Sequence, residues 1–461
     1  MKLFAHTAFV DNQWKKDVVV TIEQGYITSV DVGAKAPSAG VERIQGVLIP
    51  GIPNLHSHAF QRAFAGLAEL RQNGIAQDNF WSWRSTMYEF AKRLTPDQVG
   101  IIAEQLYIEM LKSGYTSVAE FHYLHHTQKG KPYKNVTVMS DQVISAAKTT
   151  GIAITHLPVL YCYGGFGQRK PSSEQLRFAN DVDNYAKIID SLTTRFKGDM
   201  DVKIGCALHS LRAIDNGLLR NSIELTNQYS DDLPIHIHIA EQEKEVSDCL
   251  ISSGSRPVEW LFERADIGRR WSLIHSTHIC EEELNLIASS ECVVGLCPST
   301  EANLGDGIFP AAEFIELGGL FGVGSDSQIT INPFDELRIL EYGQRLKHQK
   351  RAMVASYKET SIGESLITRA LKGGAQSLGI EAGAIAVGKR ADLVVLDDEI
   401  PALVEKPLEQ LFDCLIFAGT NGAVKDVMTA GIWRVKDRRH EREEQTLLAF
   451  KRLMKTLTTV V

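Results

Sequence analysis

The chain has 461 residues, and its hydrophobic (44%) and charged (23%) fractions are ordinary for a soluble globular protein. This length is too great for one small core and fits a large barrel with a smaller second domain. The net charge of −8 and the lack of a Lys/Arg-rich block exclude nucleic acid as an expected partner. No apolar run approaches the ~18 residues of a membrane span, so we expect neither a signal peptide nor a membrane partner.

Seven cysteines are scattered along the chain, odd in number and without a Cys-x-x-Cys spacing. This pattern is typical of reduced thiols. We therefore expect a cytoplasmic protein. A homodimer is our expectation for its assembly, and no sequence pattern bears on that point directly.

Both ends of the chain carry β patterns. Residues 1–48 contain short strand patterns separated by turns, and antiparallel hairpins are expected there, although they are too few for a stable sheet by themselves. Further β patterns occur at 384–397 and 424–435, and a polar stretch after Asp437 leads into a helical pattern. The sequence thus predicts a small β-sandwich domain built from 1–48 and 376–436, followed by a helical tail at 437–461.

Between residues 49 and 375, apolar strand patterns alternate with helical stretches. Eight strand candidates occur, at 47–49, 116–121, 152–157, 202–208, 233–239, 271–275, 292–297 and 320–326. One helix is expected over 96–113, ending at Gly114, and another ends at Gly151. Eight buried strands in βα alternation predict an α/β fold, a (β/α)8 TIM barrel, with a doubly wound sheet as the competing architecture.

A histidine pair follows the first predicted strand. The prolines and glycine within 50–53 are expected to terminate that strand, and His56 and His58 come next. Residues two apart in extended backbone project to the same side, so the two imidazoles can aim at one point. This arrangement suits an N-ligated metal such as zinc. A histidine pair in an ordinary surface turn is the alternative.

Polar residues also follow the other predicted strands, at the barrel end where active sites of this fold form. They are Glu120 and Tyr123 (second strand), His209 and Arg212 (fourth), His238 and Glu241 (fifth), His275 (sixth) and Asp326 (eighth). Each alone has an ordinary explanation, such as a hydrogen-bonded core histidine or a helix N-cap. Their joint occurrence at one end of successive strands favours a catalytic site.

These motifs resemble those of the amidohydrolase superfamily, in its metal-dependent aminohydrolase branch. The resemblance covers nearly the whole chain and includes the motifs at 56–58, 238–241, 275–278, 324–327 and 383–395. It implies that His56, His58, His238 and Asp326 bind one divalent metal ion, expected to be zinc. Four protein ligands of this kind leave room for a bound water. Dinuclear members use a bridging lysine or glutamate near the fourth strand. Lys203 lies at the entry of that strand, the wrong end, so one metal ion is expected.

A narrower set of motifs resembles the members of this superfamily that convert N-formimino-L-glutamate to N-formyl-L-glutamate and ammonia in bacterial histidine degradation. These motifs lie at 55–62, 81–84, 120–126, 209–212 and 297–307. The implied substrate is a cationic amidine with two carboxylates. Arg84 and Arg212 can bind carboxylates in bidentate fashion, with Gln61, Tyr123 and His209 as further partners. A surface ion pair is the alternative for Arg84.

For the reaction we expect Asp326 to help remove the proton of the attacking water. His275 is expected to orient the hydroxide and to stabilise charge on the new oxygen, and Glu241 to pass a proton to the departing nitrogen. The nearer alternative is an aminohydrolase of a cyclic amidine, such as a purine, pyrimidine or pterin base, which does not need paired arginines. A non-catalytic relative is the more distant one, and the intact ligand set argues against it.

Overall fold

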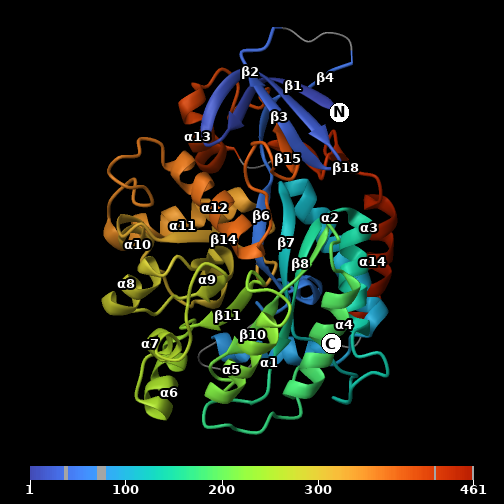
Figure 1. Cartoon of the computed structure of the whole chain (residues 1–461), viewed down its shortest axis with the longest axis vertical. Coiled ribbons are helices and arrows are strands. Elements are labelled where there is room, and N and C mark those ends of the chain that lie inside the picture. The colour runs from blue at the N-terminus through green and yellow to red at the C-terminus, as the bar shows by residue number, and fades with distance from the viewer. Residues whose placement is uncertain (36–39, 70–78, 420–421, 459–461) are drawn as a thin grey trace.

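The computed structural model describes residues 1–35, 40–69, 79–419 and 422–458 (Figure 1). Its longer strands form two sheets, one of parallel strands and one that is mainly antiparallel. In Figure 1 the second sheet lies at the top, where blue strands from the start of the chain meet red strands from its end. The parallel sheet lies below it and carries the site described in the next section.

The parallel sheet is a barrel, as the sequence predicts. Within the described residues its order is β6 (Ile52–Ser57), β7 (Tyr115–His122), β8 (Ala153–Leu160), β10 (Cys206–Ser210), β11 (Ile235–Ile239), β12 (Trp271–His275), β13 (Val293–Leu296) and β14 (Leu320–Val323). A parallel bridge between Ser57 and Asp326 joins the first strand to the segment after the last. Sequential neighbours around a ring are the arrangement of a (β/α)8 barrel, so the doubly wound sheet is excluded.

The start of the barrel differs from the prediction. The apolar run that we assigned to the first barrel strand is β5 (Val47–Pro50), which pairs with strands of the other sheet. The barrel strand is β6, so Pro53 lies inside a strand instead of ending one. The pairing of β6 with β7 is irregular between Ile52 and Pro53, and proline, which has no N–H to donate, is accommodated at such irregularities.

The fourth predicted strand is also divided. A short strand, β9 (Val202–Ile204), pairs with β8 and is separated from β10 by Gly205. A side chain at Gly205 would come within 2.6 Å of Leu157 and 2.9 Å of the Pro234 carbonyl oxygen, so the close approach of neighbouring segments requires glycine there.

The second sheet unites the two ends of the chain, as predicted. Its main path runs β18 (Arg439–His440), β17 (Ile432–Lys436), β16 (Val424–Thr429), β15 (Leu393–Leu396), β5, β1 (Lys2–Val10), β2 (Gln13–Glu23) and β3 (Tyr26–Val32), and β4 (Glu42–Arg43) pairs with β1. Side chains such as Leu3, Val20, Leu48, Val395 and Met428 form a buried core of their own. The exact limits that we expect for the domains stay a prediction.

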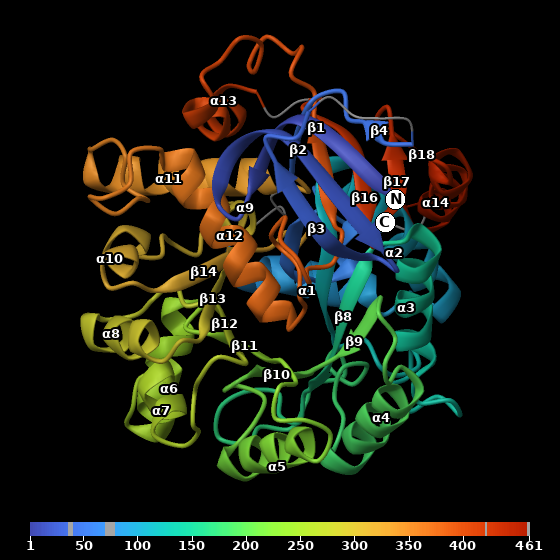
Figure 2. The ribbon, with the colours of Figure 1, turned by 45° about the horizontal axis from the view of Figure 1, so that its top comes forward.

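Helices surround the barrel strands (Figure 2). Their bounds are α1 (Phe80–Ala91), α2 (Pro96–Ser113), α3 (Val138–Thr150), α4 (Val182–Arg195), α5 (Asn216–Asn227), α6 (Glu243–Ser253), α7 (Pro257–Phe262), α8 (Glu281–Ser289), α9 (Pro298–Leu304), α10 (Ala311–Glu316), α11 (Pro333–His348), α12 (Ile362–Leu378), α13 (Leu411–Ala418) and α14 (Glu443–Thr458), with 3-10 turns η1 (Ala59–Ala63) and η2 (Leu408–Gln410). Helix α2 has the predicted limits. Over the described ranges, no helix is long and apolar enough to cross a membrane.

Helix α12 lies unusually close to the two strands at which the barrel closes. A side chain at Gly373 would meet the Phe321 carbonyl oxygen at 2.0 Å, and one at Gly374 would meet Pro53 of β6 at 2.9 Å. Both glycines are buried in the middle of the helix, where glycine is otherwise unfavourable. The absent side chains therefore allow α12 to seat against β6 and β14.

Replacing Gly373 with alanine should lower the free energy of unfolding by about 1–3 kcal/mol, because the new methyl group forces α12 away from β14. This loss exceeds the gain of about 1 kcal/mol that alanine brings to a helix interior. Urea denaturation measures it. Lys372→Ala, on the exposed side of the same helix, is the matched control and should stay within about 0.5 kcal/mol of the parent. Equal stability of Gly373→Ala and the parent would refute the tight contact.

Candidate active site

Three histidines and an aspartate meet at the carboxyl ends of the barrel strands. His56 lies near the end of β6 with His58 just beyond it, His238 lies in β11, and Asp326 follows β14. The Nε2 atom of His56 lies 3.2 Å from Nε2 of His58 and 3.0 Å from Nε2 of His238. Oδ1 of Asp326 lies 3.5 Å from Nε2 of His56 and 3.3 Å from Nε2 of His58. All four side chains are buried, so the predicted ligands do come together.

Nε2 of a neutral His56 carries either one proton or one lone pair, so it cannot donate to one neighbouring ring and accept from the other. Burial lowers the pKa of His56 and His238 well below the usual value and that of His58 to about 3, so all three rings are neutral. His58 Nδ1 lies 2.8 Å from the Phe121 carbonyl oxygen and donates to it, which leaves a lone pair on Nε2 facing the cluster. A cation between the rings removes this conflict. Three nitrogens and one carboxylate oxygen fit a divalent ion such as Zn²⁺.

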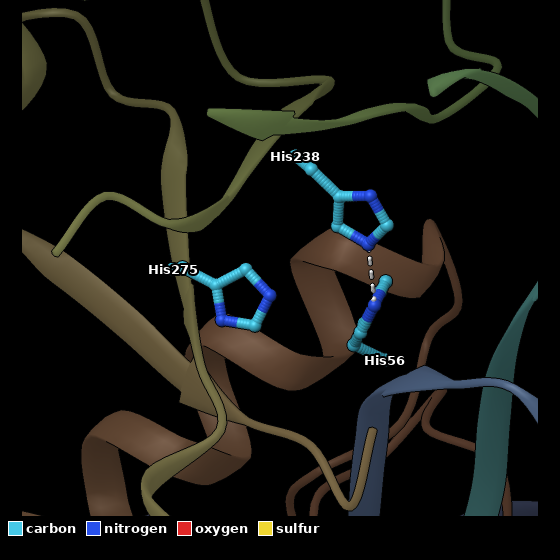
Figure 3. A group of neighbouring side chains, drawn as sticks. All are labelled: His56, His238 and His275. Atoms are coloured by element: carbon cyan, nitrogen blue, oxygen red, sulfur yellow. Dashed lines mark hydrogen bonds between the residues drawn. The ribbon is translucent and has the colours of Figure 1, made fainter. Parts of the chain in front are cut away.

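His275 approaches the same cluster from β12. Figure 3 shows its ring turned toward His56 and His238. Its Nδ1 lies 3.2 Å from Glu301 Oε1, and its Nε2 lies 3.9 Å from Glu241 Oε1 and 3.8 Å from Asp326 Oδ2. Burial would lower the pKa of His275, but the hydrogen bond to Glu301 and the charges of Glu241 and Asp326 raise it to about 10. His275 is thus a cation beside the cluster, able to stabilise a developing oxyanion.

The backbone of these segments is strained in a way common at functional sites. Ala240, His275 and Asp326 have φ values of 51°, 70° and 42°, in the left-handed region that residues other than glycine rarely occupy. Hydrogen bonds hold these conformations. The Asp326 N–H donates to the His56 carbonyl at 3.0 Å, and the His58 N–H donates to the Asp326 carbonyl at 3.2 Å. The end of β6 and the segment after β14 are therefore hydrogen-bonded to each other beside the cluster.

A pocket lies against this cluster. Ten of the eleven site residues that the sequence predicts line it: Gln61, His58, Arg84, Tyr123, His209, Arg212, His238, Glu241, His275 and Asp326. His56, the remaining one, is completely buried behind His58 and His238. The sequence therefore located one common site, and the individual roles of these residues stay predictions.

Two arginines stand on the wall of the pocket. Arg212 Nη2 lies 3.5 Å from Glu241 Oε2, and its Nη1 is buried with no partner in the described part of the chain. Arg84 lies over the Trp81 ring at 4.4 Å, and among the described residues no carboxylate forms an ion pair with it. It faces the pocket, which argues against the surface ion pair that we considered. Gln61 donates to the Tyr123 hydroxyl at 2.8 Å.

Glu301, Tyr88 and Tyr161 lie at or beside the site, and none of them has a role in the sequence-based prediction. Glu301 holds His275 and also accepts a hydrogen bond from the Cys297 N–H at 2.8 Å. It lies in the 297–307 motif, which we noted only for its resemblance. Tyr161 lines the pocket with its ring 4.4 Å from that of His209. It directly follows β8, so inspection of every strand end would have found it. Tyr88 lies on α1, and no local signal marked it.

Lys203 lies far from this site, as predicted. It lines a hollow of about 610 Å³ at the opposite, amino-terminal end of the barrel strands, together with Asp201 and Arg390. Its ammonium group donates to the Gly379 carbonyl. It therefore cannot bridge metal ions in the cluster of His56, His58, His238 and Asp326.

Comparison with known proteins places the chain in a family. The model of the amidohydrolase family matches residues 47–434. The chain belongs to the amidohydrolase family. It is 45% identical over 448 residues to formimidoylglutamate deiminase of Pseudomonas aeruginosa, covering 97% of each chain. It is also 27% identical to 5-methylthioadenosine/S-adenosylhomocysteine deaminase of Thermodesulfovibrio yellowstonii, covering 93% of this chain and 92% of the relative.

Comparison with solved structures gives the same result. The crystal structure of an amidohydrolase from Brucella melitensis matches this amidohydrolase with a TM-score of 0.93 and 42% identity over 99% of each chain. An adenosine deaminase from Xanthomonas campestris with bound zinc matches with a TM-score of 0.83, and its 21% identity shows the shared fold alone. The resemblance to the superfamily that the motifs carry is confirmed, and so is the narrower one, by the 45% identical relative.

Replacing Glu301 with glutamine should lower the pKa of His275, because His275 loses a charged hydrogen-bond acceptor. Histidine NMR titration of the metal-free protein measures this, with Glu301→Gln compared to the parent. Glu341→Gln is the matched control, because Glu341 is an equally buried carboxylate that bonds to the Met353 and Val354 N–H groups instead. An unchanged His275 pKa in Glu301→Gln would mean that Glu241 and Asp326 alone keep this ring charged.

Proposed function

We propose that this amidohydrolase hydrolyses N-formimino-L-glutamate to N-formyl-L-glutamate and ammonia, a step of histidine degradation, with one bound divalent metal ion, zinc. The observation that carries the proposal is the joint presence of Arg84, Arg212 and a His/Asp metal-ligand cluster in one pocket. The 45% identity to the formimidoylglutamate deiminase of Pseudomonas aeruginosa over 97% of both chains supports it.

The pocket suits both ends of this substrate. Its two carboxylates need charge-assisted donors, and guanidinium groups provide bidentate ones. Arg212 has a buried Nη1 without a partner among the described residues, which is available for such a bond. Its formimino end is a cationic amidine, and Glu241 and Asp326 offer negative charge close to the cluster. Gln61, Tyr123 and His209 line the same pocket and are available as neutral partners.

His56, His58, His238 and Asp326 would hold the metal ion, which supplies Lewis-acid activation of a water molecule when bound. The proposal of a single ion rests on the position of Lys203 at the other end of the barrel. Burial also raises the pKa of Asp326 to about 7, against the lowering effect of His275. A bound divalent ion would lower this pKa and keep the carboxylate ionised, so that Asp326 can accept a proton.

The proton steps follow from these positions. Asp326 accepts a proton from the attacking water, and the oxygen bonds to the formimino carbon to give a tetrahedral intermediate. The His275 cation stabilises charge on that oxygen. Glu241, whose Oε1 lies 3.9 Å from His275 Nε2, takes the remaining proton of that oxygen and passes it to the departing nitrogen. The carbon–nitrogen bond then breaks, ammonia leaves, and the formyl group remains.

An aminohydrolase of a cyclic amidine is the second candidate. The 27% identical relative from Thermodesulfovibrio yellowstonii favours it, because that protein is a 5-methylthioadenosine/S-adenosylhomocysteine deaminase. A nucleobase has no carboxylates, however, and would leave Arg84 and the buried Nη1 of Arg212 without a partner among the described residues. The linear dicarboxylate amidine is therefore the better fit.

We also propose that the protein resides in the cytoplasm. All seven cysteines are free, and disulfides are rare in that reducing compartment. Our expectation of a homodimer stays a proposal, for which sedimentation equilibrium is the direct measurement.

Two measurements test the proposed function. Elemental analysis of protein purified without added metal should give about one equivalent of a divalent metal per chain, because His56, His58, His238 and Asp326 are the proposed ligands of a single ion. Ammonia release should show a far higher kcat/KM for N-formimino-L-glutamate than for adenine, guanine, cytosine or their nucleosides. Two metal equivalents would refute the single site, and a preferred nucleobase would favour the second candidate.

Replacing Glu241 and replacing Arg84 should change the steady-state kinetics in different ways. Glu241→Gln keeps the shape but removes the base, so kcat should fall by about 10²–10⁴-fold with the metal retained. Arg84→Ala loses a carboxylate contact worth about 1.5–3 kcal/mol, which should appear mainly as a higher KM. Steady-state kinetics with metal analysis of both variants measures the difference. Near-normal kcat in Glu241→Gln would assign the proton transfer to another group.

Arg84 is a cleaner probe of substrate binding than Arg212. Because Arg212 Nη2 lies 3.5 Å from Glu241, Arg212→Ala should change both KM and kcat. An unchanged KM in both arginine variants would mean that the carboxylates of the substrate lie elsewhere in the pocket.

A further inference from the structure

Glu120 is a buried carboxylate that the proposed mechanism does not use. It lies in β7 and is 1% exposed. Oε2 accepts hydrogen bonds from the Ser57 hydroxyl at 2.7 Å and the Tyr107 hydroxyl at 3.3 Å, and Oε1 accepts one from the Ala59 N–H at 2.6 Å. Within the described residues no lysine or arginine pairs with it. A buried carboxylate without an ion-pair partner depends on hydrogen bonds from its neighbours. The identity of these donors therefore indicates what Glu120 does.

Two of these donors flank a predicted metal ligand. Ser57 lies between His56 and His58, and Ala59 follows His58. The Glu120 carboxylate therefore accepts hydrogen bonds from the residues on both sides of His58. The His58 ring is oriented by the Phe121 carbonyl oxygen, one residue beyond Glu120, at 2.8 Å. Strand β7 thus fixes both the main chain and the ring of this histidine.

The same contacts continue to the other side of the barrel closure. Ser57 accepts a hydrogen bond at 3.1 Å from Gln328 Nε2, which also donates to the Asp326 carbonyl at 2.6 Å. Ser325 donates to Gln328 at 2.8 Å, and Asn54 of β6 donates to Ser325 at 2.7 Å. Buried hydrogen bonds therefore run from Glu120 across β6 to the segment that carries Asp326. They bridge the place where the first and last strands join.

We propose that Glu120 is a positioning residue that holds His56, His58 and Asp326 in their metal-binding arrangement, so that its loss speeds release of the metal. The inference rests on the metal site of the proposed function. Groups that orient metal ligands without touching the metal typically contribute 10–100-fold to metal affinity. Glutamine is the sharp replacement, because it keeps the shape of Glu120 but turns one acceptor oxygen into an NH₂ donor. It cannot accept hydrogen bonds from both Ser57 and Ala59 at two oxygens.

The experiment follows release of zinc from the loaded full-length chain into an excess of a chelating dye. Glu120→Gln should release zinc about 10–100-fold faster than the parent. Glu336→Gln is the matched control. Glu336 is a completely buried carboxylate that accepts hydrogen bonds from the Ser299 N–H and hydroxyl, away from residues 56–59. This control should release zinc at the parental rate, even where it lowers stability as much.

The outcomes separate the possible roles. Recovery of kcat by Glu120→Gln at saturating zinc, together with fast release, supports positioning. Parental release overturns the proposal, and so does a lost kcat with zinc retained, which would make Glu120 part of the chemistry or of general stability. Should Glu120→Gln not fold, Ser57→Ala removes the hydroxyl that links Glu120 to Gln328 and must show the same fast release. A parent chain without metal refutes the proposed metal site itself, which is a separate result.

Discussion

The convergence of three neutral imidazoles on one point is the constraint on which the rest of the site depends. Burial keeps His56, His58 and His238 uncharged, and the Phe121 carbonyl directs a lone pair of His58 into the cluster. The Nε2 atoms of His58 and His238 lie 3.2 and 3.0 Å from that of His56. Without a cation, neutral His56 cannot donate to one of them and accept from the other. The barrel imposes this arrangement by bringing its first, fifth and last strands together, and positive φ angles at Ala240 and Asp326 are part of its cost.

A second feature is the separation of charge along the pocket. At the cluster, the carboxylates of Glu241, Glu301 and Asp326 surround the His275 cation. On the wall, Arg84 lies over the Trp81 ring without an ion-pair partner among the described residues, while Arg212 lies near the Phe80 ring and pairs with Glu241. A ligand with a cationic end and a carboxylate end is therefore oriented before any reaction takes place. This polarity explains why a charged linear amidine suits the pocket better than a neutral ring.

The sequence predicts those parts of the molecule that local patterns determine. Helix α2 begins at Pro96 after the Thr95 cap and ends at Gly114, with φ of 102°, because both signals act within one turn. Site residues at strand ends were predictable because a barrel collects all its strand ends on one face. The division of residues 47–57 into β5 and β6 was not, since one apolar stretch cannot reveal that its halves belong to different sheets. The pairing of Glu301 with His275 likewise depends on two distant segments.

The contact between Arg212 and Glu241 links substrate recognition to proton transfer. The guanidinium of Arg212 faces Glu241, and its other nitrogen Nη1 is unpartnered among the described residues. A substrate carboxylate on Arg212 would compete with Glu241 for the same positive charge and so free that carboxylate to move a proton. Residues that share a charge in this way do not contribute independently. Combined replacement of Arg212 and Glu241 should therefore cost less in kcat/KM than the two single losses added together.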